Sequence, residues 1–379
     1  MPWHEVNTMS LRREFVHLAS EPGANIAQLT RRFAISRTCG YKWLTRFRAE
    51  GEAGLRERSR RPHTSPRQTP PAVEAAVVEL RQADPAWGGR KLAVLLAEKG
   101  IAPVPAPSTI TGILRRHREL DPQVSAEHQR WQRFEHPTPN ALWQMDFKGH
   151  FPTLTERCHP LTVLDDHSRY ALVLHACPDE RTATVQGALI PAFRRYGLPA
   201  AILTDHGSPW GDDADSPYTR LGVWLLRLGI EVWHGHPYHP QTQGKDERFH
   251  GTLQRELLRD RLFVDLADCQ RAFDAWRERY NTVRPHESLG QQRPAYRYQL
   301  SPRPYPEVLP TIDYAVGALV RRVQLGGHLS FQGRQLHVPK AFVGQPVAVR
   351  PLERDGWVVV YFSSYPIAEI ELTTCPKAS

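Results

Sequence analysis

The chain has 379 residues and a mass of 43.3 kDa, which at ~150 residues per domain allows two or three domains. With 40% apolar and 23% charged residues the composition excludes wholesale disorder, and the lack of a regular glycine repeat excludes a collagen-like fibre. The net charge of +9 lies almost entirely in the first third, because residues 1–140 hold 22 Lys and Arg against 14 Asp and Glu. A basic part joined to a near-neutral body indicates one region that holds a polyanion, unless the sign of the surface charge is accidental.

Cysteine content and hydropathy indicate the cellular compartment in which the protein is expected. The five cysteines are scattered singly with no C-x-x-C pair, which argues against a disulfide framework or a cysteine zinc site. No apolar run approaches the ~18 residues of a membrane-spanning helix, and the first residues do not have the pattern of a secretory signal. We therefore expect a cytoplasmic protein without a membrane segment.

Residues 10–54 are predicted to form a helix-turn-helix. Ile26, Leu29 and Phe33 share one helical face, and Ser36 is suited to cap a second helix. That second helix mixes aromatic with basic side chains, as a helix that reads a DNA groove does, whereas an ordinary helical hairpin is the plainer alternative. The DNA contacts expected on it are Arg37, Lys42, Arg46 and Arg48.

Residues 55–71 hold five arginines, four prolines and almost nothing apolar, so they are predicted to be a linker. Arginines of such a linker could follow phosphates or enter a minor groove, although basic linkers are often only solubilising. The candidates are Arg58, Arg60 and Arg61.

Residues 72–122 are predicted to form a second helix-turn-helix. Its last helix ends in a run of basic side chains, from which we expect Arg115 and Arg116 to contact DNA. Two such units joined by a basic linker suit a long, bipartite DNA site.

Strand and helix patterns alternate over residues 136–300. Trp143 and Met145 share one face of a predicted strand, and Gln144 and Asp146 share the other. Two β-rich runs that follow predict an antiparallel hairpin, and the apolar run 200–203 after a helix predicts a parallel strand. This order is typical of an α/β fold with a mixed sheet flanked by helices.

Residues 313–379 have a third texture. They are rich in β-branched residues, with period-two stretches and Gly-containing turns. We expect a small all-β barrel, joined to the α/β region by a Pro-rich linker over residues 302–310.

Three acidic residues fall where an α/β fold usually places its site. Asp146 lies on the polar face of its strand, Asp205 just after an apolar strand, and Glu247 in the first turn of a helix. Singly, each has an ordinary explanation as a solvated residue, a turn former or a charge that complements a helix dipole. Together they make an oxygen-only site suited to Mg²⁺ or Mn²⁺, and two such ions would balance three carboxylates and one phosphodiester.

The segments around these acids carry a longer pattern. They read Trp143-Gln-Met-Asp146-Phe147, Leu203-Thr-Asp205-His-Gly207, Tyr238-His-Pro-Gln-Thr-Gln-Gly-Lys-Asp-Glu247-Arg-Phe-His-Gly-Thr-Leu253 and Tyr280-Asn-Thr-Val-Arg-Pro-His286-Glu-Ser-Leu289. Over residues 140–300 this pattern resembles the integrase-core transposases of bacterial insertion sequences. The resemblance implies a ribonuclease H-like catalytic core, a metal-bound triad of Asp146, Asp205 and Glu247, and two Mg²⁺ (or Mn²⁺) ions in each active site.

One departure concerns the third acid. Asp246 stands beside Glu247 where an apolar residue is expected, so it competes for the assignment. Because Asp246 extends the helical row of Phe249, Leu253 and Leu257, we place Glu247 in the site.

The resemblance also implies a function. The chain would be a transposase that cleaves and transfers DNA strands as a homo-oligomer, with terminal repeats and target DNA as partners and no small-molecule cofactor. It would lie in the bacterial cytoplasm, on the nucleoid when bound. A DNA-binding regulator with a silent core and a stand-alone nuclease are the alternatives. Further DNA contacts are expected around the third acid, at His239, Gln243, Lys245 and Arg248.

Overall fold

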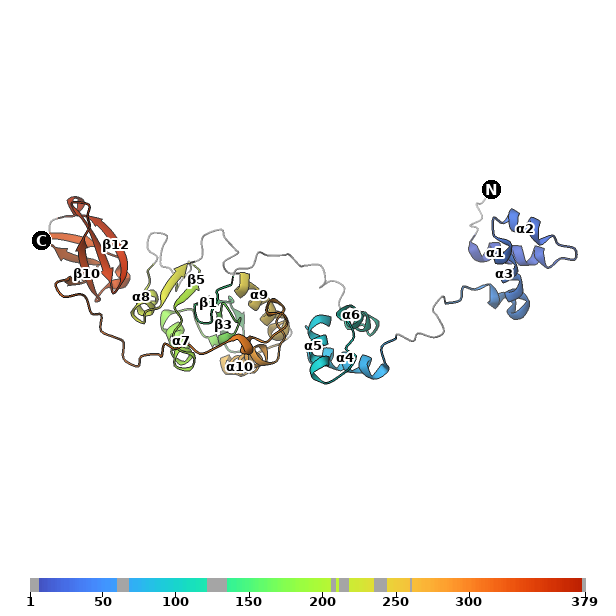
Figure 1. Cartoon of the computed structure of the whole chain (residues 1–379), viewed down its shortest axis with the longest axis horizontal. Coiled ribbons are helices and arrows are strands. Elements are labelled where there is room, and N and C mark those ends of the chain that lie inside the picture. Colours follow the sequence, from blue (N-terminus) through green and yellow to red (C-terminus); the bar gives the residue numbers. More distant parts are fainter. Residues whose placement is uncertain are drawn as a thin grey trace. The chain divides into compact units, whose positions relative to one another are not determined.

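The computed structural model describes residues 7–59, 68–120, 135–205, 209–210, 218–234, 244–259 and 261–376 (Figure 1). The chain divides into two compact units, residues 1–68 and 69–379. Among the described helices, none is both long and apolar enough to cross a bilayer.

The first unit is a three-helix cluster. Its helices are α1 (Thr8–Ala19), α2 (Ile26–Arg32) and α3 (Arg37–Glu50), followed by a short 3₁₀ turn at Gly51–Leu55. The predicted cap is confirmed, because the Ser36 hydroxyl accepts the Cys39 backbone N–H at 3.1 Å. Gly40 lets α3 approach its neighbours closely, since a Cβ there would lie 2.6 Å from Thr30 and 2.8 Å from Phe15.

The second unit begins with another helical trio. It consists of α4 (Pro71–Ala83), α5 (Gly89–Glu98) and α6 (Pro107–Arg116). The three helices share a small core in which Trp87, Leu92 and Ile110 are buried. Two small clusters of three helices are thus present, one before the basic linker in the sequence and one after it.

A mixed sheet follows. Its strands are β1 (Leu142–Phe147), β2 (Phe151–Pro152), β3 (Arg157–Asp165), β4 (Ala171–Cys177), β5 (Ala201–Thr204) and β6 (Glu231–His234). The order is β2-β3-β1-β5-β6, with β4 also paired to β3. β3 is antiparallel to β1 and β4, whereas β5 is parallel to β1 and β6. The predicted hairpin and the predicted parallel strand are both confirmed.

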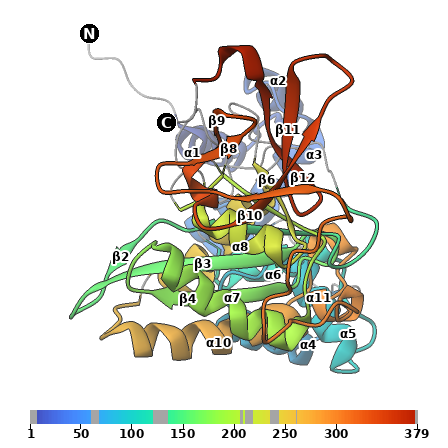
Figure 2. The same cartoon turned by 90° about the vertical axis from the view of Figure 1, so that its left-hand side faces the viewer.

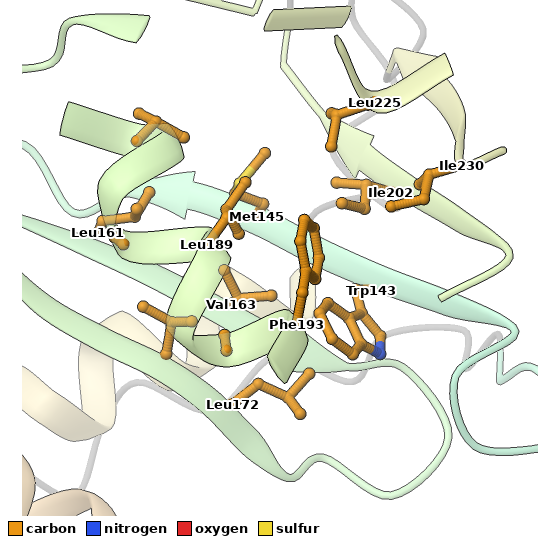
Figure 3. Close-up of a cluster of buried hydrophobic side chains, with 14 of the residues drawn as sticks. Trp143, Met145, Leu161, Val163, Leu172, Leu189, Phe193, Ile202, Leu225 and Ile230 are labelled. Atoms are coloured by element: carbon orange, nitrogen blue, oxygen red, sulfur yellow. The ribbon is translucent and has the colours of Figure 1, made fainter. Parts of the chain in front are cut away.

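Helices cover both faces of this sheet. The helices are α7 (Thr182–Tyr196), α8 (Arg220–Arg227), α9 (Gly244–Leu253), which continues as a π-helical turn at Gln254–Leu258, α10 (Leu266–Thr282) and α11 (Pro294–Arg297). Trp143 and Met145 of β1 pack toward α7, where Phe193 stacks on Trp143 with ring centroids 5.8 Å apart (Figure 3). Side chains of β3 and β4 on the opposite face pack against α9 and α10. Asp146, between Met145 and Phe147, therefore lies on the α9 side.

The Pro-rich segment is bound to the core rather than free. The Arg303 guanidinium donates to the carbonyls of Pro199 at 2.7 Å, Leu228 at 3.0 Å and Gly229 at 2.7 Å. Gly197 has a φ of +78°, and a Cβ on it would lie 2.8 Å from the Arg303 carbonyl. The predicted linker is thus a strap, because its arginine satisfies carbonyls at the ends of core elements that composition alone does not reveal.

The C-terminal part is all-β. Its strands are β7 (Leu319–Arg322), β8 (His328–Phe331), β9 (Arg334–His337), β10 (Pro346–Pro351), β11 (Trp357–Phe362) and β12 (Tyr365–Glu371). They form an antiparallel sheet in the order β12-β11-β10-β7 and a separate β8–β9 hairpin, so the described strands do not close into the expected barrel. The core under this sheet includes Val223 and Leu226 of α8, and Figure 2 shows β10 and β12 beside that helix.

Candidate active site

Strand register brings the first two acids together. β1 and β5 are parallel, with Gln144 opposite Leu203. Asp146 lies two residues further along β1, and Asp205 directly follows the last residue of β5. The Asp205 carboxylate is near enough to raise the pKa of Asp146. The two carboxylates therefore come from the carboxyl ends of adjacent parallel strands, where α/β sheets bind ligands.

Helix α9 brings the third acid. Glu247 is exposed in its first turn, and His250, one turn later, reaches the floor of the site. The His250 Nδ1 atom lies 4.0 Å from the Asp146 Oδ2 atom. Because residues three apart on a helix share a face, Glu247 lies on the Asp146 side of α9.

The pKa of the Asp146 carboxyl is raised by its surroundings. Burial, together with the nearby Asp205, Glu180 and Glu247 carboxylates, raises the pKa of its carboxyl to about 7. A carboxyl with a pKa this high is removed from water and has other acidic groups close to it.

Asp246 adds a fourth carboxyl, and it is the buried one. Its side chain is 2% exposed, as its place in the apolar row of α9 predicted, and its Oδ1 atom has no hydrogen-bond partner among the described residues. Burial, with the charges of Asp146 and Asp166, holds the pKa of this carboxyl well above its usual range. The positive charge of the neighbouring Lys245 lowers the pKa of Asp246 only in part, because the Lys245 ammonium forms an ion pair with the fully buried Asp166 carboxylate.

Two residues that the sequence did not single out complete the floor. His250 Nε2 lies 2.8 Å from the Thr162 hydroxyl, which donates to the Asp146 carbonyl at 2.9 Å. Burial and the positive charge of Lys148 lower the pKa of His250 to about 4, so its ring is neutral at physiological pH. The helical spacing from Glu247 to His250 was a usable signal, and the hairpin register that sets Thr162 opposite Asp146 was another.

The donor set fits a hard divalent cation. The acids supply only oxygen atoms, the type that Mg²⁺ and Mn²⁺ prefer, and the Asp246 Oδ1 atom is buried without a hydrogen-bond partner among the described residues. In the described parts of the chain, no three His, Cys, Asp or Glu side chains gather closely enough to hold an ion as they stand. An ion at Asp146 would therefore need Asp205 or Glu247 to close on it.

The basic residues predicted to contact DNA are spread over both units. On α3, Lys42 and Arg46 lie over the Trp43 ring, at 4.7 Å and 5.2 Å from its centroid. Two arginines are engaged within the chain, Arg58 with Glu50 and Arg116 with Glu74 at 2.5 Å. The other described candidates are exposed, namely Arg37, Arg48, Arg115 and Arg248. Outside the described residues lie Arg60, Arg61, His239 and Gln243.

Five segments of the chain match known protein families. The family described as integrase core domain matches residues 136–240 and again residues 228–294. Residues 11–63 match a helix-turn-helix domain, residues 39–114 a homeodomain-like domain, and residues 318–377 the C-terminal domain of the IS481 family of transposases. The helical, α/β and all-β parts of the chain are each covered.

Similar proteins extend these matches. An uncharacterized 39.2 kDa protein of insertion element IS476 from Xanthomonas euvesicatoria is 28% identical over 305 residues, which cover 78% of this chain and 85% of that protein. An uncharacterized 31.7 kDa protein of insertion element IS407 from Burkholderia multivorans is 29% identical over 157 residues, 41% of this chain and 54% of the relative. Among solved structures, the HTLV-2 integrase catalytic core domain in complex with magnesium aligns with 43% of this chain and 99% of its own, at 17% identity and a TM-score of 0.34.

Proposed function

We propose that the chain cleaves the ends of a DNA element and joins them to target DNA. Segments of it match the integrase core domain, which its acidic motifs indicated, a helix-turn-helix domain and the C-terminal domain of IS481 family transposases. The observation that supports this proposal is that Asp146 and Asp205 come from the ends of two adjacent parallel strands, and that the Asp205 and Glu247 carboxylates both raise the pKa of Asp146.

The reaction has two steps of one kind. Hydrolysis of a phosphodiester at each element end frees a 3′ hydroxyl, and that hydroxyl then displaces a 3′ oxygen from a target phosphodiester, so bonds made equal bonds broken. Divalent ions, when bound, activate the attacking oxygen and stabilise the leaving one. Asp146 and Asp205 would hold them from the sheet and Glu247 from α9. No protein nucleophile is required.

The remaining parts of the chain fit this task. We assign binding of the terminal repeats to residues 10–54 and 72–122, joined by the basic segment 55–71, and the chemistry to residues 136–300. On α3 the basic side chains around Trp43 support a groove-reading role. Joining two ends at one target requires two active sites, so we propose that the protein acts as a homo-oligomer on DNA.

The first test is strand transfer with Asp205→Asn. Labelled DNA from the flanks of the chain's own gene would be incubated with Mg²⁺ or Mn²⁺, and joined products and end binding would be measured side by side. We expect Asp205→Asn to abolish joined products while end binding stays within twofold of wild type. Asp313→Asn, which changes an exposed aspartate outside the α/β sheet, serves as the matched control and should join normally.

Two outcomes would contradict the proposal. Loss of end binding by Asp205→Asn would make Asp205 a structural residue. Tight binding by the wild type without nicking or joining, under either metal, would favour a regulator with a silent core.

A further inference from the structure

His250 lies at the floor of the proposed site without belonging to its acidic triad. Its side chain is 14% exposed, its Nε2 atom lies 2.8 Å from the Thr162 hydroxyl, and its Nδ1 atom lies 4.0 Å from the Asp146 carboxylate. The role of a largely buried histidine this close to a proposed catalytic carboxyl depends on which of its nitrogens carries a proton.

The hydrogen bonds fix which nitrogen carries the proton. The Thr162 hydroxyl has one hydrogen, which it donates to the Asp146 carbonyl at 2.9 Å. Its oxygen can therefore only accept from His250, so Nε2 is the protonated nitrogen of the ring. The Nδ1 atom then carries the lone pair of the ring, and this atom lies 4.0 Å from the Asp146 Oδ2 atom.

The 4.0 Å separation distinguishes two ways of using that lone pair. A protonated Nδ1 would donate to a carboxylate at ~2.7–2.9 Å, which is much shorter than the observed distance. Two donor atoms bound to one octahedral ion at ~2.1 Å each are ~3.0 Å apart at adjacent positions and up to ~4.2 Å apart at opposite positions. The gap between His250 Nδ1 and Asp146 Oδ2 is therefore too long for a hydrogen bond and within the reach of a shared cation.

We propose that His250 Nδ1 is a ligand of the divalent cation held at Asp146, so that this site has one nitrogen donor among oxygen donors. The inference rests on the proposed function only in taking a cation to bind at Asp146. Thr162 would be the positioning residue, because its hydroxyl holds the ring in the tautomer that presents Nδ1 to the ion.

A nitrogen ligand changes which ion the site prefers. Imidazole suits transition-metal ions, whereas Mg²⁺ takes oxygen ligands almost exclusively. The chain should therefore bind Mn²⁺ more tightly than Mg²⁺, and this preference should depend on His250. Without the imidazole, the remaining carboxylates would favour the two ions more equally.

The test measures ligand identity directly. The full chain, carrying no added histidine tag, would be loaded with Mn²⁺ and examined by pulsed electron paramagnetic resonance, which detects the coupling of the ion to a bound ¹⁴N nucleus. We expect this coupling in the wild type and its loss in His250→Asn, which can place an oxygen near the Nδ1 position. The Mn²⁺ affinity of that variant should fall ~10-fold and its Mg²⁺ affinity less.

Two further variants guard against misfolding and stray binding. His250→Gln keeps a group near the Nε2 position that can reach Thr162 but removes Nδ1, so it should lose the nitrogen coupling while unfolding at the same temperature as the wild type. His337→Asn removes an exposed histidine on β9 and should keep the coupling.

The outcomes separate this inference from the proposed function. Mn²⁺ that binds in an Asp146-dependent manner without nitrogen coupling, or with coupling that survives in His250→Asn, would overturn the role of His250 and leave the proposed chemistry standing. Mn²⁺ binding that is absent, or unchanged in Asp146→Asn, would overturn the metal site and the proposed function together.

Discussion

Two carboxyls on one helical stretch have opposite surroundings. Asp246, at the start of α9, is buried with an oxygen that has no partner among the described residues. Glu256, in the π-helical turn that ends the stretch, accepts the indole N–H groups of Trp87 and Trp276 at 3.2 Å and the Arg284 guanidinium at 2.9 Å. The same fold thus gives one largely buried acid three hydrogen-bond donors and leaves an oxygen of another without one among the described residues, so we expect the first acid to stabilise the structure and the second to cost stability.

The satisfied acid joins distant parts of the second unit. Trp87 belongs to the helical trio and Glu256 to the α/β region, and further ion pairs connect the same two parts. Arg279 of α10 contacts Asp84 at 2.6 Å, and Arg293 contacts Glu98. The second helical trio is therefore held against the α/β region that carries Glu247.

Removing the Glu256 carboxylate should have the largest effect on the free energy of unfolding. Glu256→Ala leaves the buried Arg284 guanidinium without its carboxylate, so we expect the free energy of unfolding to fall by ~3–5 kcal/mol. Urea unfolding followed by tryptophan fluorescence measures this change. A loss below ~1 kcal/mol would mean that the network is not a structural lock.

Relieving Asp246 should have a smaller effect of the opposite sign. Because the folded chain raises the pKa of Asp246 above its unfolded value of ~3.9, the folded state binds more protons and its stability falls as pH rises above ~4 toward the folded pKa. Asp246→Asn removes this penalty. We expect a gain of ~1 kcal/mol at pH 8 and less at pH 5, measured by urea unfolding in EDTA.

The opposite result at Asp246 would also be informative. If Asp246→Asn destabilised the protein equally at both pH values, the carboxyl would have a stabilising partner and would belong with Glu256. The contrast between the two ends of the stretch would then disappear.

The smallest effect is expected at an exposed pair. Arg194 of α7 and Glu307 of the strap form an ion pair with two hydrogen bonds, at 2.6 Å and 2.9 Å, but both side chains are more than half exposed. Solvent screens such a pair, so Glu307→Ala should leave the urea midpoint unchanged within error. A shift of the urea midpoint comparable to that of Glu256→Ala would show that a paired carboxylate stabilises the protein whether or not it is buried.

The sequence predicted those features of this comparison that depend on residues close together along the chain. Helical periodicity predicted that Asp246 faces the core and Glu247 does not. The hairpin followed from two β-rich runs, and the parallel strand followed from the apolar run 200–203 after a helix. Periodicity could not reveal the Glu256 network, because Trp87 lies 169 residues away along the chain. The strap was missed for the same reason, since Arg303 acts through carbonyls that only the folded chain brings near it.

Helix α8 is apolar on two sides, and this has a practical consequence. Leu221 and Leu225 belong to the core of the α/β region, whereas Val223 and Leu226 belong to that of the C-terminal sheet. A protein shortened to end near residue 310 would present the second side to water, and such exposed stripes promote self-association. We therefore expect a protein that lacks only the C-terminal sheet to aggregate. Replacing Val223 and Leu226 with polar residues should make the shortened protein soluble.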